Sequence, residues 1–253
     1  MSDRKIWVAN SDGSKPLPLT SFSTGLANSP RWSPDGTRIV FAWIQNNNRD
    51  LYSISKDGTS LRPLTDEPSQ EGRPSWSRDG RWIYCYSTRS GRQEIWKLPA
   101  QGGKAVQLTT DGGHESFESP DGKLLYYEDY GNKGLKSIPL ESYSGPREGS
   151  AVLPSVRPGF WAVAEKGIYF VEFDDRYAAS QFIDYGFVVG NTGTALPIKF
   201  YDFRSGKVTP VGAIEKGVDR AGPSFSVTWD GRYIAWSQVD RGESDLMMVE
   251  NFR

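Results

Sequence analysis

The chain contains few residues that could act as catalysts, and its single histidine is the first to consider. A Ser-His-Asp hydrolase needs an activated serine on a sharp turn, and no Gly-x-Ser-x-Gly motif is present. A zinc site built on histidine and cysteine lacks ligands, because only Cys85 accompanies His114. We therefore expect no catalytic residue, no metal and no cofactor. We interpret His114 as an exposed loop residue and keep it as a candidate for ligand binding.

Carboxylate pairs are the remaining residues that could take part in catalysis or metal binding. Asp174-Asp175 and Glu128-Asp129 could take part in calcium binding or glycoside hydrolysis, but neither pair shows regular ligand spacing. We interpret both pairs as solvated loop charge. The glycines of residues 186–193 lack the spacing of a phosphate-binding loop.

Composition limits the partners of this 253-residue chain. Its 30 basic and 31 acidic residues create no global field that would attract nucleic acid. No apolar segment predicts a membrane span or a secretory signal, so the chain as written is expected to be cytoplasmic. Cys85 lies in an apolar run and predicts a packed, inert thiol.

The elements that would position any site come from a repeated phrase. Pro30-Arg31-Trp32-Ser33-Pro34-Asp35-Gly36 recurs, with variations, around Gly80, Gly122 and Gly231, and a weaker version ends at Gly167. The first intervals are 44 and 42 residues, which is the spacing of four-stranded propeller blades. Proline followed by Asp-Gly predicts a tight turn between two strands.

Each turn lies between an aromatic residue and an apolar run. The runs are apolar on both faces, as expected of strands that are covered on both sides. We predict that the aromatic residues end the first strand of each blade and fill the space between blades. They are Trp32, Trp76, Phe117, Trp161 and Trp229.

The two ends of the chain look like parts of blades. Residues 6–20 match the third and fourth strands of a repeat, and residues 224–249 match the first three. The sequence therefore predicts an all-β fold, a β-propeller of four-stranded antiparallel blades whose ring is closed by both chain ends. Five blades are expected, with six as the alternative, in a single domain over residues 1–253. An insertion loop is expected at about 174–197.

The Trp-Ser-Pro-Asp-Gly phrase at this spacing resembles the WD-like propeller repeats of the TolB type over nearly the whole chain. Residues 167–170, 200–209 and 244–253 are also similar to the ends of long bacterial regulators. In those proteins a propeller follows a winged-helix or protein kinase domain. This resemblance implies the sensory or scaffolding part of a signalling protein, and we expect the chain to be the carboxyl-terminal part of a longer protein.

Two classes of function follow. In the first, the propeller is a non-catalytic module whose loops bind a protein or peptide partner, or alternatively a small ligand. In the second, it is an enzyme or the gating propeller of a peptidase, or a carboxylate-based lyase or glycosidase. We expect binding residues just before each first strand, with ordinary surface charge as the alternative interpretation. The candidates are Arg31, Arg73, His114, Glu115 and Arg157.

Overall fold

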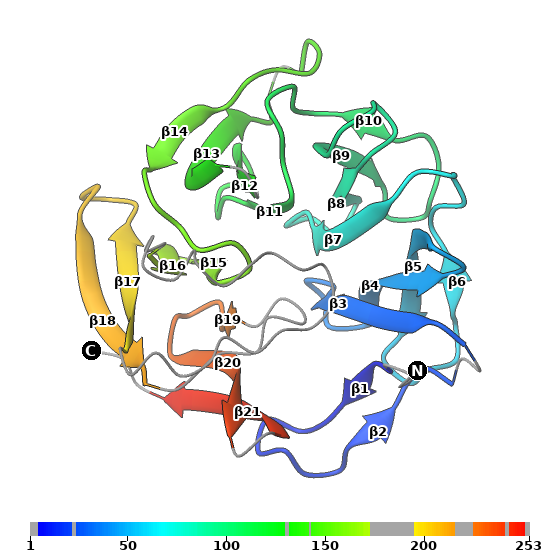
Figure 1. The fold of residues 1–253 in the computed structure, drawn as a ribbon, viewed down its shortest axis with the longest axis horizontal. Coiled ribbons are helices and arrows are strands. Elements are labelled where there is room, and N and C mark those ends of the chain that lie inside the picture. The colour runs from blue at the N-terminus through cyan, green and yellow to red at the C-terminus, as the bar shows by residue number, and fades with distance from the viewer. Residues whose placement is uncertain are drawn as a thin grey trace. The chain divides into compact units, whose positions relative to one another are not determined.

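The computed structural model describes residues 5–21, 24–129, 132–141, 143–172, 195–215, 225–240 and 243–250. Every regular element among them is a β-strand, and neighbouring strands within each sheet follow one another along the chain (Figure 1). This order is that of an antiparallel meander, in which each strand is joined to the next by a short turn. The predicted all-β class is therefore confirmed.

Four of the sheets have four strands each. The first comprises β3 (Leu26–Trp32), β4 (Arg38–Gln45), β5 (Asn48–Ser55) and β6 (Arg62–Pro63). The second comprises β7 (Glu71–Trp76), β8 (Trp82–Ser87), β9 (Glu94–Pro99) and β10 (Val106–Gln107). The third comprises β11 (Glu115–Glu118), β12 (Leu124–Asp129), β13 (Asn132–Pro139) and β14 (Ser150–Leu153). The fourth comprises β15 (Trp161–Ala164), β16 (Gly167–Val171), β17 (Leu196–Asp202) and β18 (Val208–Ile214).

The chain ends form smaller sheets. β1 (Trp7–Val8) pairs with β2 (Leu17–Pro18), and β19 (Phe225–Val227), β20 (Tyr233–Asp240) and β21 (Glu243–Glu250) form a three-stranded sheet. Both partial sheets were predicted. In the part of the chain that the structure describes, the expected five or six blades are corrected to four complete ones, because the two terminal repeats show only two and three strands there. Among the described residues, these terminal strands belong to separate sheets and show no closing pair.

The predicted insertion also ends earlier in the chain than expected. Residues 174–194 lie outside the described part of the chain, but Leu196 and Pro197 already belong to β17 and pair with Ile214 and Ala213. Pairing with β18 therefore ends the insertion before residue 196.

One turn recurs in the hairpins between first and second strands. The hydroxyl of Ser33 donates to Asp35 Oδ1 at 2.6 Å and accepts from the amide of Arg38 at 2.9 Å. Gly36 follows with a φ of 65°, a conformation that glycine adopts without steric cost. Ser77 repeats this arrangement, and so does Thr228 in the last hairpin. A hydroxyl, an aspartate and a glycine are therefore sufficient, and the missing proline at Trp229 does not alter the turn.

A second recurring contact involves the threonine that follows β2, β6 and β10. The hydroxyl of Thr65 accepts the amide hydrogen of Leu51, and that of Thr109 accepts the amide hydrogen of Ile95. Thr20 does the same for Ile6 at the amino-terminal end. Each contact satisfies a buried amide of the third strand, which would otherwise carry a desolvation cost.

The apolar runs of the second strands form the cores, as expected. Val40, Leu51, Ile83 and Cys85 belong to one cluster, and burial raises the pKa of the Cys85 thiol, so it stays protonated. The prediction that all five turn aromatics are core residues is wrong for two exposed ones, and Trp76 and Phe117 are only partly buried. Trp161 is fully buried, but Trp32 is 48% exposed and Trp229 43% exposed. Counted back from the turn serines, Phe117 takes the place of Arg31 and not that of Trp32, so the aromatics do not share one position.

The chain divides into two compact units. Unit 1 comprises Met1–Glu118, Gly122–Tyr127 and Ile138–Ser150; unit 2 comprises Ser119–Asp121, Glu128–Ser137 and Ala151–Arg253. A single domain over residues 1–253 stays a prediction. In the described part of the chain, no helix is long and apolar enough to span a membrane.

Candidate functional site

The predicted site residues do not occupy one position of the repeat. Arg31 lies near the end of β3, Arg73 lies inside β7, and Glu115 begins β11. The expectation that they precede their strands is therefore wrong for both arginines. Counted from Ser77 and Ser119, however, Arg73 and Glu115 are equivalent, since each lies four residues before the turn serine. Their opposite charges thus fall on the same place of consecutive first strands.

Three of these side chains meet in unit 1. β7 contacts both β3 and β11, which brings the first strands of three sheets together. Arg31 Nη2 donates to Glu115 Oε1 at 3.1 Å, and Arg73 Nη1 lies 3.8 Å from the same oxygen. Glu115 is only 2% exposed. Ordinary surface charge, the alternative interpretation, is therefore excluded for this cluster, which we call the arginine wall: Arg31, Arg73 and Glu115.

Burial and neighbouring charges set the electrostatics of the arginine wall. The pKa of Arg31 is lowered mainly by burial, partly restored by Glu115, and lowered again by the charge of Arg73. The guanidinium also lies over the Phe117 ring, 5.2 Å from its centroid. The second oxygen of the carboxylate, Glu115 Oε2, is buried and has no hydrogen-bond partner among the described residues. The wall thus holds an unused acceptor next to two cations.

Two β-bulges shape the backbone of the arginine wall. The ladder of β3 with β4 shifts register between Asn28 and Arg31, and that of β7 with β8 shifts between Gly72 and Ser75. Both shifts contain a proline, which has no N–H to donate to a ladder. The residue before each proline has a positive φ, 54° at Ser29 and 50° at Arg73. Bulges of this kind re-aim side chains and are common near functional sites.

His114 is buried and not exposed, which corrects the expectation from the sequence. Its side chain stacks on Tyr86 with ring centroids 5.2 Å apart and planes within 15°. Arg49 Nη1 donates to the Tyr86 hydroxyl, so a third arginine lies beside this aromatic pair. Burial, with help from Arg73 and Arg49, lowers the pKa of His114 well below its ordinary value. His114 is therefore a neutral hydrogen-bonding group next to the arginine wall.

Arg157 belongs to unit 2 and is described with that unit. It is buried in the loop before β15, its amide donates to the Val171 carbonyl at 2.8 Å, and its guanidinium lies over the Phe160 ring. These contacts hold the connection into β15. The contacts described for Arg157 are therefore made within unit 2, to Val171 and Phe160.

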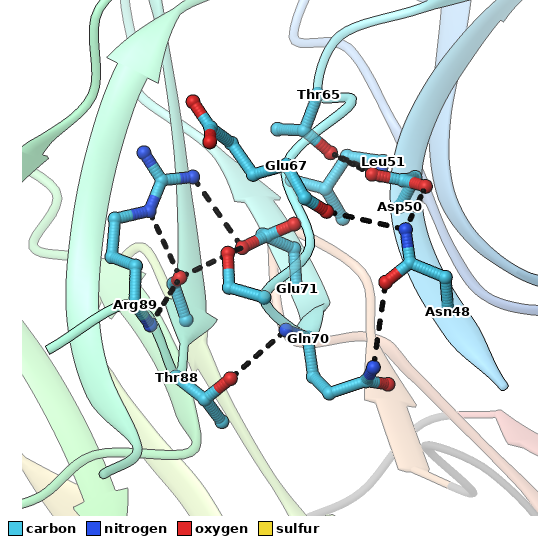
Figure 2. A network of polar contacts seen from close by, with 11 residues as sticks. Asn48, Asp50, Leu51, Thr65, Glu67, Gln70, Glu71, Thr88 and Arg89 are labelled. Atoms are coloured by element: carbon cyan, nitrogen blue, oxygen red, sulfur yellow. Dashed lines mark hydrogen bonds and ion pairs between the residues drawn. The ribbon is translucent and has the colours of Figure 1, made fainter. Parts of the chain in front are cut away.

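A polar network that sequence reasoning missed fixes the connection into β7. Figure 2 shows Gln70 and Glu71 between the two flanking sheets. The backbone amide of Gln70 donates to Thr88 Oγ1 at 2.9 Å, and its side-chain amide donates to the Asn47 carbonyl at 3.0 Å. These contacts tie the segment before Arg73 to the hairpins of both sheets. The sequence offered no signal, because the polar residues differ between repeats.

Glu71 is the centre of this network. Its Oε1 atom accepts from Ser87 at 2.8 Å and lies 3.4 Å from Arg89 Nη2, as Figure 2 shows. The side chain is fully buried, and Oε2 has no hydrogen-bond partner among the described residues. The pKa of nearby Asp50 is raised chiefly by burial and further by the charge of Glu71. Glu71 is therefore paired with Arg89, and its charge also acts on Asp50.

The other chemical candidates do not form a site. Among the described residues, no cluster of three histidine, cysteine or acidic side chains could hold a metal ion. Asp174 and Asp175 lie outside the described residues. Glu128 is buried, which corrects its interpretation as solvated charge.

Repeated four-stranded antiparallel sheets with Ser-x-Asp-Gly turns define a β-propeller protein. More narrowly, residues 2–149 match the family described as the TolB beta propeller domain. The chain therefore belongs to that family.

The proteins that this chain is similar to include a TolB protein and two enzymes. Dipeptidyl-peptidase 5 of Porphyromonas endodontalis is 25% identical over 97% of this chain, which spans 34% of the peptidase. The crystal structure of TolB from Acinetobacter baumannii is similar over 97% of this chain and 57% of its own length, with 18% identity and a TM-score of 0.71. An oligogalacturonate lyase in complex with manganese is similar over 99% of this chain and 72% of its own, with 11% identity and a TM-score of 0.63. At these identities the two structures support the fold alone.

Proposed function

We propose that the chain is the non-catalytic binding propeller of a larger protein and that it holds a protein or peptide partner at the arginine wall. The observation that carries this proposal is Glu115 Oε2, a buried acceptor without a partner among the described residues, beside two arginines at 3.1 and 3.8 Å. Buried polar groups are normally satisfied, and a ligand is one way to satisfy them.

The resemblance of the carboxyl-terminal repeats to bacterial regulators supports a finer proposal. In it, the propeller is the sensory or scaffolding part of a regulatory protein. A winged-helix or kinase domain encoded in the same reading frame would support this assignment. A reading frame with neither domain would contradict it.

Capture of the partner tests the main proposal. Immobilised chain is incubated with extract of its own host, and retained proteins are quantified by mass spectrometry. We expect a near-stoichiometric partner that an Arg31→Gln/Arg73→Gln double variant fails to retain. Arg81→Gln is the matched control, because Arg81 belongs to the same unit and forms only an exposed ion pair with Asp79. Equal retention by all three proteins would contradict the proposal.

A second candidate function is the gating propeller of a peptidase. It is favoured by the match to dipeptidyl-peptidase 5, which extends over 97% of this chain while covering only 34% of the enzyme. In this case the catalytic groups would lie in another domain, since the described residues contain no assembled nucleophile and base. A hydrolase domain encoded in the same reading frame would support this candidate.

Under either candidate function, we expect that the 253-residue chain alone does not catalyse a reaction. Chromogenic dipeptide substrates and oligogalacturonate, with and without manganese, are suitable probes. The rate of substrate conversion is compared with that in buffer alone. A rate that exceeds this background and rises in proportion to the concentration of the purified chain would contradict both candidates and favour a propeller enzyme.

A further inference from the structure

We infer that β18 pairs edge to edge, in antiparallel orientation, with β18 of a second copy of this chain. β18 belongs to unit 2, whereas the arginine wall belongs to unit 1, so this pairing does not depend on the proposed binding function. Three features of β18 support it: its length and composition, the direction of its backbone groups, and the opposite charges at its two ends.

β18 is long for an outer strand and carries no charge. It has seven residues, whereas β2, β6 and β10 have two each and β14 has four. It is the last strand of its sheet, beyond β17 (Figure 1), and five of its seven residues are exposed. Proteins commonly protect sheet edges by short strands and by charged side chains. β18 has neither protection.

The backbone of β18 directs hydrogen-bonding groups away from β17. The amide of Asp202 donates to the Lys207 carbonyl at 3.0 Å, and the next pair along the ladder is Tyr201 with Val208. In an antiparallel ladder, this pair has no mutual hydrogen bonds, so the N–H and C=O of Val208 face the edge of the sheet. Pro210 occupies the next such position, where its missing N–H costs no bond to β17.

The two ends of β18 carry opposite charges. Lys207 precedes the strand and Glu215 follows it, and both are exposed. Neither side chain forms an ion pair within the described ranges. Antiparallel pairing places Lys207 beside Glu215 of the partner subunit at both ends, whereas parallel pairing would bring like charges together. Because opposite charges across a strand pair stabilise it and like charges destabilise it, the antiparallel arrangement is favoured.

Neighbouring charges leave this pattern in place. In the turn before β18, Asp202 and Arg204 carry opposite charges and offset each other. On the adjoining strand, Lys199 Nζ is paired with Glu172 Oε2 at 2.5 Å. Lys216 follows at the other end of β18 but lies outside the described residues, so its charge needs a control variant of its own.

A pair of this kind is closed and weak. Under two-fold symmetry both copies use the same edge, so β18 offers no further edge to a third copy. Pro210 and the bulge beside it limit the number of hydrogen bonds across the pair. One strand pair is also small compared with a stable protein interface, so the dimer should form reversibly as the concentration rises.

Analytical ultracentrifugation of the 253-residue chain tests the inference, at concentrations from low micromolar to near millimolar. We expect a reversible equilibrium between monomer and dimer. Hydrogen exchange measured by mass spectrometry locates the contact, since peptides covering β18 should exchange more slowly at high concentration and peptides covering β10 should not change. A chain that stays monomeric throughout this range would overturn the inference.

Charge reversal tests the orientation of the two strands. Lys207→Glu and Glu215→Lys each bring like charges together at both ends, and each should weaken dimerisation at least about tenfold. The double variant restores opposite charges and should dimerise within about threefold of the parent. Lys216→Gln should not weaken the dimer. Lys104→Glu is the matched control, because Lys104 is an exposed lysine before β10 in another sheet.

Each remaining outcome contradicts a defined part of the inference. Single variants that weaken the dimer without rescue by the double variant would overturn the antiparallel arrangement, and so would a loss of the dimer in Lys216→Gln. A dimer that no variant weakens, and whose β18 amides exchange as in the monomer, would overturn the assignment to β18. Circular dichroism verifies that every variant is folded, and the exchange of β18 in the parent decides if one is not.

Discussion

Glu115 is the residue at which the first strands of three sheets are joined electrostatically. Its Oε1 atom faces Arg31 and Arg73, which lie 84 and 42 residues earlier in the chain. Removing one partner from a buried charged cluster costs more than the pair contributes, because the remaining charge stays buried. The pKa of His114, the residue before it, is lowered first by burial and then by the charges of Arg73 and Arg49. These two adjacent residues thus respond to one local field.

Replacing the carboxylate tests this field. We expect Glu115→Gln to lower the free energy of unfolding by roughly 2–4 kcal/mol, since Arg31 and Arg73 would lose the buried carboxylate that lies 3.1 and 3.8 Å from them. Urea unfolding followed by tryptophan fluorescence measures the change. The control is Arg81→Gln, whose ion pair is exposed and should contribute less than about 1 kcal/mol. Equal small effects of the two substitutions would show that the cluster is not coupled.

Titration of His114 gives a prediction with a definite sign. Because its pKa in the folded chain is lowered below the ordinary value near 6.5, the unfolded chain takes up a proton first as the pH falls. The stability that neutral His114 contributes is therefore complete above about pH 6.5 and is lost progressively below it, by up to about 1.4 kcal/mol per pH unit.

The chain has one histidine, so the comparison is clean. We measure the free energy of unfolding by chemical denaturation at several pH values. His114→Gln should remove the part of its decrease between pH 7 and pH 5 that comes from this histidine. Asp50 contributes the opposite sign, because its pKa is raised, but it is present in both proteins and cancels in the difference. Parallel curves for parent and variant would contradict the assignment.

Each sheet is completed by side chains that replace missing backbone partners. The turn hydroxyls of Ser33 and Ser77 accept an amide hydrogen at the start of the second strand, and the threonines that follow the fourth strands accept an amide hydrogen from within the third. Thr109 also donates to Glu94 Oε2 at 2.6 Å, so one hydroxyl satisfies two buried groups. The short fourth strands, such as β10, have few ladder bonds and depend on these contacts.

A pair of substitutions at Thr109 separates the hydroxyl from the methyl group. Thr109→Val keeps the shape but leaves the Ile95 amide and Glu94 without this partner, so we expect a loss of roughly 2–3 kcal/mol in the free energy of unfolding. Thr109→Ser keeps the hydroxyl and should lose less than about 1 kcal/mol. Guanidinium unfolding of both variants checks the order. A serine variant as unstable as the valine variant would show that packing decides at this position.

The molecule combines complete sheets with partial ones, and its stability should be distributed accordingly. Buried second and third strands supply the cores of unit 1, including Ile83, Cys85 and Leu98. In the described part of the chain, β1 and β2 pair only with each other. Two-stranded sheets are marginal by themselves, whereas central strands of larger sheets open only with the whole structure.

Hydrogen exchange measured by mass spectrometry tests this distribution. We expect amides of β8 and β9 to exchange slowest among the described strands and those of β1 and β2 to exchange orders of magnitude faster. Peptides covering β4 and β5 serve as the internal comparison, since they form the centre of another complete sheet. Slow exchange in β1 and β2 would reveal a further strand partner.

The repeat in the sequence was sufficient for the strands and the turns, because these depend on residues close together in the chain. Gly36 and Gly80 mark the hairpins, and the apolar runs around Ile39 and Ile83 mark the buried strands. The partial sheets at both ends were predicted in the same way. The number of complete sheets was overestimated, because counting hairpins does not show which strands pair.

The arginine wall was decided only by the tertiary structure. Arg31, Arg73 and Glu115 were all candidates and were expected just before each first strand. In the structure they lie in the strands, and both arginines approach one carboxylate next to bulges that contain Pro30 and Pro74. The burial of His114 and the exposure of Trp32 were missed for the same reason. Such environments arise from contacts between strands about 40 residues apart, and the local pattern of residues carries no information about that packing.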